Sequence, residues 1–173
     1  MQHRRQPRTV QRRARRTVRI VCEGDAEVCV VRHVRDLYTS GGDGRALSHR
    51  NARSKGGRRA LELALSRQVK AGVDVMVILI DVDQDWDDSL RQRARAQGVQ
   101  VLESVPCLEA WLLQVTGHVA PANSAACKRA FRTAFGGEAH EQEIYGRHFS
   151  RAALDGARST VPVLDQLLRL IGV

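Results

Sequence analysis

The chain has 173 residues, 43% of them hydrophobic, which suits a single domain with a substantial core. Its formal net charge of +9 favours a polyanionic partner or a basic tail. The longest apolar run is only as long as a β-strand, and no apolar segment follows the basic N-terminus, so we expect neither a membrane span nor a secretory signal.

The cysteines show no C-x-x-C pair and fall in or beside the strands and helices that the sequence predicts. This pattern is more typical of reduced core residues than of a zinc site, and it favours a cytoplasmic protein. The four residues concerned are Cys22, Cys29, Cys107 and Cys127.

Residues 1–16 contain seven arginines and almost no apolar side chains. Such a segment cannot bury enough surface to offset the entropy lost on ordering, so we predict a flexible basic arm before a single domain at 17–173. The arm either contacts nucleic-acid phosphates without reading the base sequence or is an extension without a role.

The first predicted strand is TVRIVC at 17–22, and the apolar spacing of residues 25–38 predicts an amphipathic helix directly after it. Glu23 and Gly24 therefore lie in a tight turn from strand to helix, where Gly24 supplies backbone freedom. The Glu23 carboxylate either faces the carboxyl edge of the sheet or only caps the helix.

A short second strand is predicted within 45–51, and the apolar stripe of residues 60–70 predicts a second helix. The polar stretch between them, RNARSKGGRR at 50–59, contains a Gly-Gly pair that either cradles a phosphate at the helix N-terminus or belongs to a solvated loop, and it lacks the spacing of a P-loop. Four basic residues in this stretch are candidates for clamping a nucleic-acid backbone, namely Arg50, Arg53, Lys55 and Arg58.

The central stretch is VMVILIDVDQDWDD at 75–88, an unbroken apolar run that ends in five aspartates around one tryptophan. The run predicts a strand buried on both faces of a parallel sheet. The aspartates then follow its carboxyl end, where open parallel sheets place their chemistry.

Asp81 and Asp83 are two residues apart, so both carboxylates point to one side if strand geometry persists across Val82. Like charges this close repel one another and raise one pKa unless a cation or an arginine neutralises them, and the simplest reason for the arrangement is a bound divalent metal ion. Asp85 is a further candidate ligand, whereas Asp87 and Asp88 are expected to begin the next helix.

A helix at 89–96 and a strand at 99–103 follow, and Pro106 then lies near the first turn of another helix. Glu109 is surrounded in the sequence by Cys107, Leu108, Trp111 and Leu112, so burying it is costly unless it is paired or binds a metal. Glu109 is therefore either a fourth acidic ligand or a solvent-facing glutamate.

The remainder is predicted to be helical, at 124–135, at about 150–159 and from Pro162 onward. The sequence therefore predicts a three-layer α/β fold: a four-stranded, mainly parallel sheet with helices on both faces and a helical C-terminal extension. His49 and His148 are either proton shuttles or structural histidines.

Three segments together resemble the RloB-like branch of the Toprim superfamily, which is related to the OLD nucleases. They are VRIVCEGDAE at 18–27, VMVILIDVDQD at 75–85 and ESVPCLEAWLLQVTG at 103–117, of which the third is the most specific. The resemblance implies a Toprim-like sandwich fold.

The resemblance also implies an acidic site in which Glu23, Asp81, Asp83 and Glu109 are catalytic, with Asp85 as a further metal ligand. Ser104 and Pro106 would shape the loop before Glu109. Tyr145 and Arg147 occupy what resembles a late Tyr-x-Lys motif, with Arg in place of Lys, and Arg147 would contact nucleic acid.

The function that the resemblance implies is a Mg²⁺- or Mn²⁺-dependent nuclease that hydrolyses phosphodiester bonds of DNA or RNA, in bacterial phage defence. The alternative is a non-catalytic Toprim-like module that binds nucleic acid or a protein partner in a defence complex. A third class, a phosphohydrolase with Asp81 as nucleophile, needs a nearby lysine, and no lysine follows Asp83 before Lys128.

Overall fold

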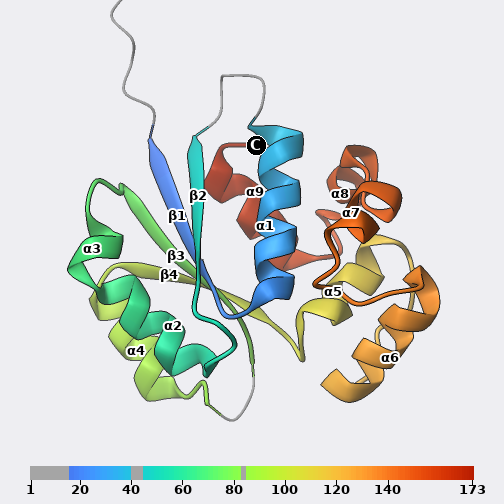
Figure 1. Ribbon diagram of the computed structural model, residues 1–173, viewed down its shortest axis with the longest axis horizontal. Coiled ribbons are helices and arrows are strands. Elements are labelled where there is room, and N and C mark those ends of the chain that lie inside the picture. Colours follow the sequence, from blue (N-terminus) through green and yellow to red (C-terminus); the bar gives the residue numbers. More distant parts are fainter. Residues whose placement is uncertain (1–15, 40–44, 83–84) are drawn as a thin grey trace, which may run out of the picture.

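The computed structural model describes residues 16–39, 45–82 and 85–173 (Figure 1). Four parallel strands form one sheet in the order β2-β1-β3-β4, which confirms the predicted four-stranded sheet. The strands are β1 (Thr17–Cys22), β2 (Ala46–Asn51), β3 (Val75–Asp81) and β4 (Val99–Ser104).

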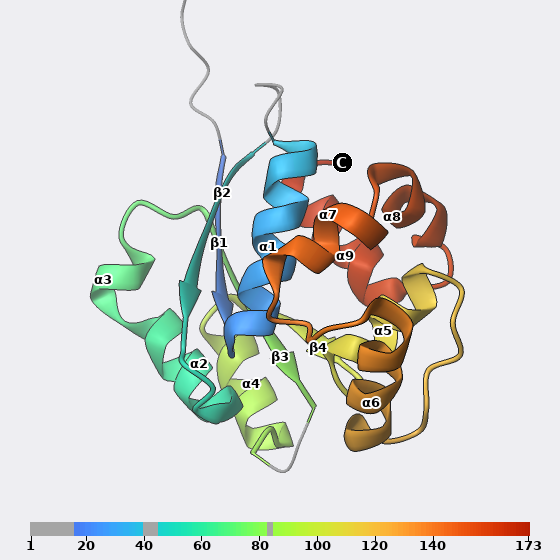
Figure 2. The ribbon, with the colours of Figure 1, turned by 45° about the vertical axis from the view of Figure 1, so that its right-hand side comes forward.

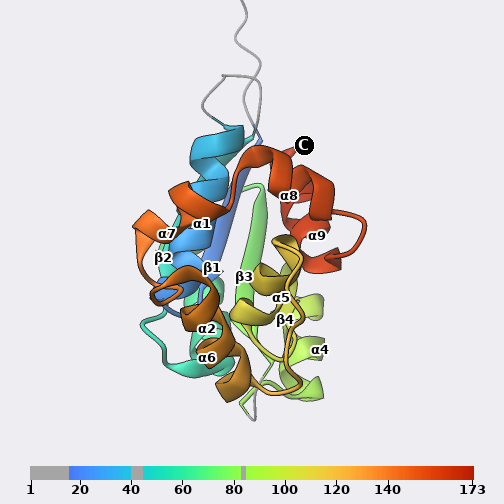
Figure 3. The ribbon, with the colours of Figure 1, turned by 90° about the vertical axis from the view of Figure 1, so that its right-hand side faces the viewer.

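Helices cover both faces of the sheet, as predicted, and the arrangement is consistent with a Toprim-like sandwich (Figures 1 and 2). One face carries α2 (Gly56–Leu65), α3 (Arg67–Lys70) and α4 (Asp88–Ala96). The other face carries α1 (Asp25–Tyr38), α5 (Leu108–Val115) and α9 (Pro162–Ile171). The helices α6 (Ser124–Phe135), α7 (Gln142–His148) and α8 (Arg151–Ala157) complete the C-terminal extension on the α1 side (Figure 3).

The central strand β3 contributes to two apolar cores, one on each face of the sheet. Val77 and Leu79 pack in the core beneath α1 and α5, whereas Ile78 and Ile80 pack in the core beneath α2 and α4. Alternation along a strand sends successive side chains to opposite faces, so a strand covered on both sides needs an unbroken apolar run.

The chain order brings the ends of β1 and β3 together at a topological switch point. From β1 the chain passes through α1 to β2 on one side, and it then returns through α2 and α3 to β3 on the other side. The Glu23 amide donates to the Leu79 carbonyl at 3.1 Å, which extends the pairing of β1 and β3 beyond β1. Such switch points leave a crevice at the carboxyl ends of the strands.

The second helix begins at Gly56, four residues before the predicted start, and the Gly-Gly pair is part of it. A β-carbon at Gly57 would lie 2.8 Å from Cε3 of Trp86, so the absence of a side chain lets the buried indole pack there. The pair is therefore a packing contact rather than a solvated loop. The helix also breaks at Ser66, whose backbone is extended and whose hydroxyl donates to the Leu63 carbonyl at 2.8 Å.

The prediction of a basic arm at 1–16 falls almost wholly outside the described residues, which begin at Arg16. Within the described ranges, no helix has the length and apolar character needed to cross a membrane.

Candidate metal centre

The crevice between β1 and β3 opens into an acidic cleft of about 450 Å³. Its walls come from the β1–α1 turn, the carboxyl end of β3, the first turn of α5, the loop before α2, and the region from α6 to α7. The residues that line the acidic cleft are Glu23, Gly24, Asp25, Ala26, Glu27, Ser54, Asp81, Glu109, Lys128, Glu138, Ala139 and His140.

Asp81, the last residue of β3, is hydrogen-bonded to the turn between β1 and α1 and to the start of α5. Its amide donates to Oε2 of Glu23 at 3.1 Å, and its Oδ1 accepts from the Leu108 amide at the start of α5 at 2.8 Å. The Glu23 carboxylate therefore lies at the carboxyl edge of the sheet, next to the end of β3, which agrees with the first of the two interpretations of its position.

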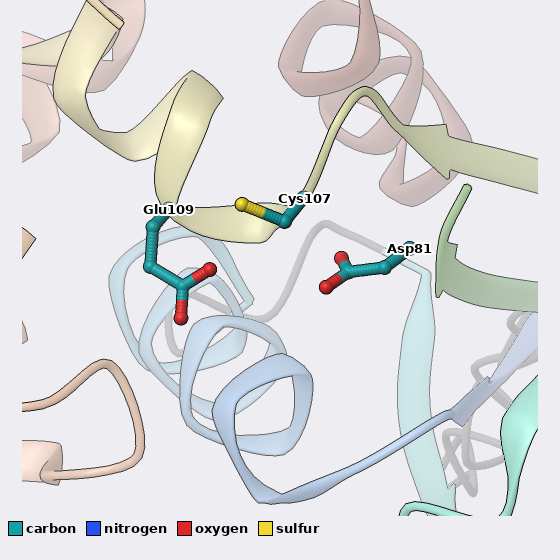
Figure 4. Close-up of side chains that lie close together, drawn as sticks. All are labelled: Asp81, Cys107 and Glu109. Carbon is teal, nitrogen blue, oxygen red and sulfur yellow. The ribbon is translucent and has the colours of Figure 1, made fainter. Parts of the chain in front are cut away.

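Glu109 faces Asp81 across the cleft from the first turn of α5 (Figure 4). One potential ligand atom from each of Asp81, Cys107 and Glu109 lies within 4.8 Å of the other two. Glu109 is only 7% exposed, and its Oε2 has no hydrogen-bond partner among the described residues. A buried carboxylate oxygen is costly to leave unsatisfied, so this atom points to a ligand.

The motif around Glu109 fixes the start of α5 against the end of β4. The Trp111 indole N–H donates to the buried Ser104 hydroxyl at 3.1 Å, and the Ser124 hydroxyl donates to the Pro106 carbonyl at 3.2 Å. These bonds hold the first turn of α5 where the Leu108 amide meets Asp81 and where Glu109 faces the acidic cleft.

Burial and mutual repulsion raise the pKa values of two carboxyl groups in the acidic cleft. Burial raises the pKa of Asp81 to about 8, with contributions from the charges of Glu27, Glu109 and Glu23 that exceed the effect of the Leu108 amide. Burial also raises the pKa of Glu27 to about 7, although hydrogen bonds from the backbone oppose it. The cluster is thus short of positive charge, and a bound cation would stabilise the ionised forms.

Glu27 was not identified from the sequence. It is 5% exposed, and its Oε2 accepts from the Gly24 amide at 2.9 Å, which closes the N-terminus of α1. The signal was present, because Glu27 precedes Val30, Val31 and Val34 by three, four and seven residues and so shares their buried face.

Lys128 of α6 also lines the acidic cleft and was not selected as a site residue. Burial lowers its pKa, but the acidic groups around it, Glu109 and Asp81 foremost, together outweigh burial and raise the pKa above its ordinary value. Nothing in the sequence marked this residue beyond its position on the basic face of a helix.

The aspartates after β3 do not all reach the acidic cleft. Asp83 lies outside the described residues. Asp85 is not among the described residues that line the cleft, and it lies beside α2, where a β-carbon at Gly56 would be 2.9 Å from its Oδ2. Asp87 caps α4 by accepting from the Leu90 amide at 2.9 Å, and α4 begins at Asp88, as predicted.

Glu103 of β4 binds the segment around Trp86 on the α4 side of the sheet. Oε1 of Glu103 accepts from the Trp86 indole at 2.6 Å and from Nε of Arg91 at 2.7 Å. This anchor holds Trp86 in the core beneath α2 and α4, and its neighbour Asp85 lies beside Gly56 of α2.

The predicted phosphate-clamping residues, Arg50, Arg53, Lys55 and Arg58, are all exposed. Arg53 and Lys55 flank Ser54, which lines the acidic cleft and whose amide donates to the Glu23 carbonyl at 2.7 Å. Arg53 and Ser54 have positive φ angles of 62° and 53°, a conformation that non-glycine residues keep only where the surroundings impose it. Arg58 is exposed on α2.

The late Tyr-x-Arg pair is not part of the acidic cleft in the described portion of the chain. Tyr145 is 1% exposed in the core, and its hydroxyl donates to the Ala139 carbonyl at 2.7 Å. Arg147 is exposed on α7, where its Nε donates to the Glu143 carbonyl at 3.4 Å. His148 packs against the Phe135 ring.

The residues of the acidic cleft fit a hard divalent cation. Asp81 and Glu109 offer carboxylate oxygens, with Glu23 beside them, and Mg²⁺ and Mn²⁺ prefer such ligands. Cys107 is a poor ligand for such an ion, because hard cations prefer oxygen to sulfur, and burial and the charge of Glu109 raise the pKa of its thiol.

Comparison with models of protein families, with curated proteins and with solved structures found no match to this chain.

Proposed function

We propose that this chain is a divalent-metal-dependent nuclease that hydrolyses phosphodiester bonds of DNA or RNA. The observation that carries the proposal is the buried Oε2 of Glu109, which lacks a hydrogen-bond partner within the described ranges, in a group whose ligand atoms lie within 4.8 Å of one another. The resemblance to RloB-like Toprim proteins supports the proposal, since it selects Glu23, Asp81 and Glu109, and it suggests a role in phage defence.

Asp81, Glu109 and Glu23 would hold the Mg²⁺ or Mn²⁺ ion. The bound ion would stabilise negative charge on the phosphate oxygens and lower the pKa of a water molecule. Glu27 lines the same cleft, and its Oε2 accepts from the Gly24 amide, so its Oε1 can accept a hydrogen bond or a proton from a water molecule there. The ammonium of Lys128 can contact a non-bridging oxygen of the scissile phosphate, because it lines the same cleft.

The surroundings favour nucleic acid as the substrate. Arg53 and Lys55 flank the cleft-lining Ser54, and the whole chain carries a net charge of +9. Contacts of this kind bind phosphates in any sequence context, which suits a nuclease without base recognition.

The proposal is tested by incubating the purified protein with plasmid, single-stranded DNA and transfer RNA in Mn²⁺, Mg²⁺ or EDTA. We expect cleavage only with metal, and loss of cleavage in the double variant Asp81→Ala, Asp83→Ala and in Glu109→Gln. Glu62→Gln is the matched control, because Glu62 is exposed on α2 and pairs only at the surface with Arg59, at 3.2 Å.

Undiminished cleavage by the double variant would refute the assignment. Retention of nucleic acid by both wild type and variant, without cleavage under any metal condition, would instead favour the non-catalytic module of a defence complex.

A further inference from the structure

A second pocket of about 400 Å³ adjoins the acidic cleft and shares Asp25 and His140 with it. Its walls come from α1, from the end of the edge strand β2 and from the loop before α7. We call it the basic pocket; its lining residues are Asp25, Val28, Cys29, Arg32, His49, Arg50, Asn51 and His140.

The positive charge of the basic pocket is not neutralised by ion pairs. None of the ion pairs formed within the described ranges involves Arg32 or Arg50. One guanidinium N–H of Arg50 donates to the His49 carbonyl at 3.2 Å, which leaves its other N–H groups available to a ligand.

The half-buried imidazole of His49 reports the electrostatic potential in the basic pocket. Burial lowers its pKa, and the charges of Arg32, Arg35 and Arg50 lower it further. The contribution of the arginines marks a positive potential at this ring, and such a potential favours an anion beside it.

The single carboxylate of the pocket lies at its border with the acidic cleft. Asp25 Oδ1 accepts from the Asn51 side chain at 2.6 Å, and Asn51 Oδ1 in turn accepts from the Arg53 amide at 2.6 Å. Asn51 therefore holds Asp25 at the shared rim. Arg32 and Arg50 line the basic pocket but not the acidic cleft.

We infer that the basic pocket binds a phosphate group of the nucleic acid whose neighbouring phosphodiester occupies the acidic cleft. The two sites share a rim, and a nucleic-acid strand presents phosphates in succession. Arginine suits this task because its planar guanidinium donates two parallel hydrogen bonds to phosphate oxygens. Val28 and Cys29 give the pocket an apolar wall for the attached sugar. The inference depends on the proposed function for the position of the strand.

The first test measures binding without cleavage. Full-length Asp81→Asn protein in EDTA is titrated with a short single-stranded oligonucleotide that carries a 3′ fluorophore, with and without a 5′ phosphate. We expect Arg32→Gln and Arg50→Gln each to weaken binding about tenfold, the effect of one charge-assisted hydrogen bond. Arg93→Gln is the matched control, because Arg93 is exposed on α4 across the sheet.

The two oligonucleotides identify which phosphate is bound. Preference for the 5′-phosphorylated strand, lost in the arginine variants, assigns the basic pocket to a terminal phosphate. Equal binding of both strands, weakened in the arginine variants, assigns it to an internal phosphodiester. Equal affinities for Arg32→Gln, Arg50→Gln and Arg93→Gln overturn the inference.

The second test needs neither nucleic acid nor metal. Inorganic phosphate added to the wild-type protein should shift the His49 ring signals in NMR spectra and raise its pKa, and both effects should vanish in the arginine variants. A His49 response without any nuclease activity supports the pocket and refutes the proposed function. Nuclease activity with an unresponsive His49 supports the proposed function and refutes phosphate binding in the basic pocket.

Discussion

Replacing Asp81 with Asn should stabilise the metal-free protein and abolish its stabilisation by metal. In the folded state the pKa of Asp81 rises from its ordinary value of 3.8 to about 8, chiefly through burial. The shift of about 4 units, at about 1.4 kcal/mol per unit, sets an upper limit of about 5 kcal/mol on the cost of this carboxyl to folding at pH 8.

The measured gain should be smaller, because solvent in the open cleft screens the repulsion. We expect the free energy of unfolding to rise by about 1–3 kcal/mol. Asn keeps an oxygen at Oδ1, so the 2.8 Å hydrogen bond from the Leu108 amide survives the substitution.

The assay is thermal unfolding at pH 8, followed by circular dichroism, in EDTA and in saturating Mn²⁺. For a chain of this size a gain of about 2 kcal/mol raises Tm by about 4–8 °C. In EDTA the variant should therefore melt above the wild type, whereas Mn²⁺ should raise Tm of the wild type only. Glu62→Gln should behave like the wild type in both conditions.

Two results would refute this reasoning. A lower Tm for Asp81→Asn in EDTA would mean that the carboxylate contributes favourably to the metal-free fold. Equal stabilisation of variant and wild type by Mn²⁺ would mean that Asp81 does not bind the ion.

Four further predictions follow from the same contacts. In EDTA, the urea midpoint of the wild type should fall between pH 5 and pH 8, because Asp81 and Glu27, with pKa values of about 8 and about 7, hold protons in the folded chain that the unfolded chain has lost; a rising midpoint would contradict this. Ser104→Ala removes the acceptor of the Trp111 indole and should cost about 1–3 kcal/mol in urea unfolding and weaken Mn²⁺ binding in calorimetry, whereas unchanged binding would show that this bond does not position Glu109. Gly57→Ala places a β-carbon 2.8 Å from the Trp86 ring and should cost about 1–3 kcal/mol without weakening Mn²⁺ binding; equal stability would mean that the indole relaxes freely. Lys128→Gln should slow cleavage about 10–100-fold while Mn²⁺ binding is retained or tightened, and a loss of metal affinity would contradict its placement opposite the phosphate.

The local pattern of the sequence was enough to predict the strands and most of the helices. A short apolar run rich in β-branched residues, such as 75–80, favours a strand covered on both faces, and the turn at Glu23 and Gly24 follows from a strand that ends where a helix begins. The helix that begins at Asp88 was predicted for the same reason, because an aspartate before an amphipathic segment is a local signal.

The composition of the site depends on contacts between segments far apart in the chain. The sequence made Asp81 and Asp85 both candidate ligands, but Trp86 is hydrogen-bonded to Glu103 on the α4 side and Asp85 lies beside α2, whereas Asp81 faces Glu109. The earlier start of α2 has the same origin, since Gly57 is adjacent to Trp86 only in three dimensions.

By itself, the sequence determined the four strands and most of the helices, and that Glu23, Asp81 and Glu109 lie at their ends, because those features depend on residues within a few positions of one another; α7 (Gln142–His148) was not predicted. Only the tertiary structure decided that Glu27 and Lys128 join the acidic cleft and that Arg32 and His49 share a pocket beside it. The strand order and the crossover helices bring these side chains together, and no local periodicity encodes that arrangement.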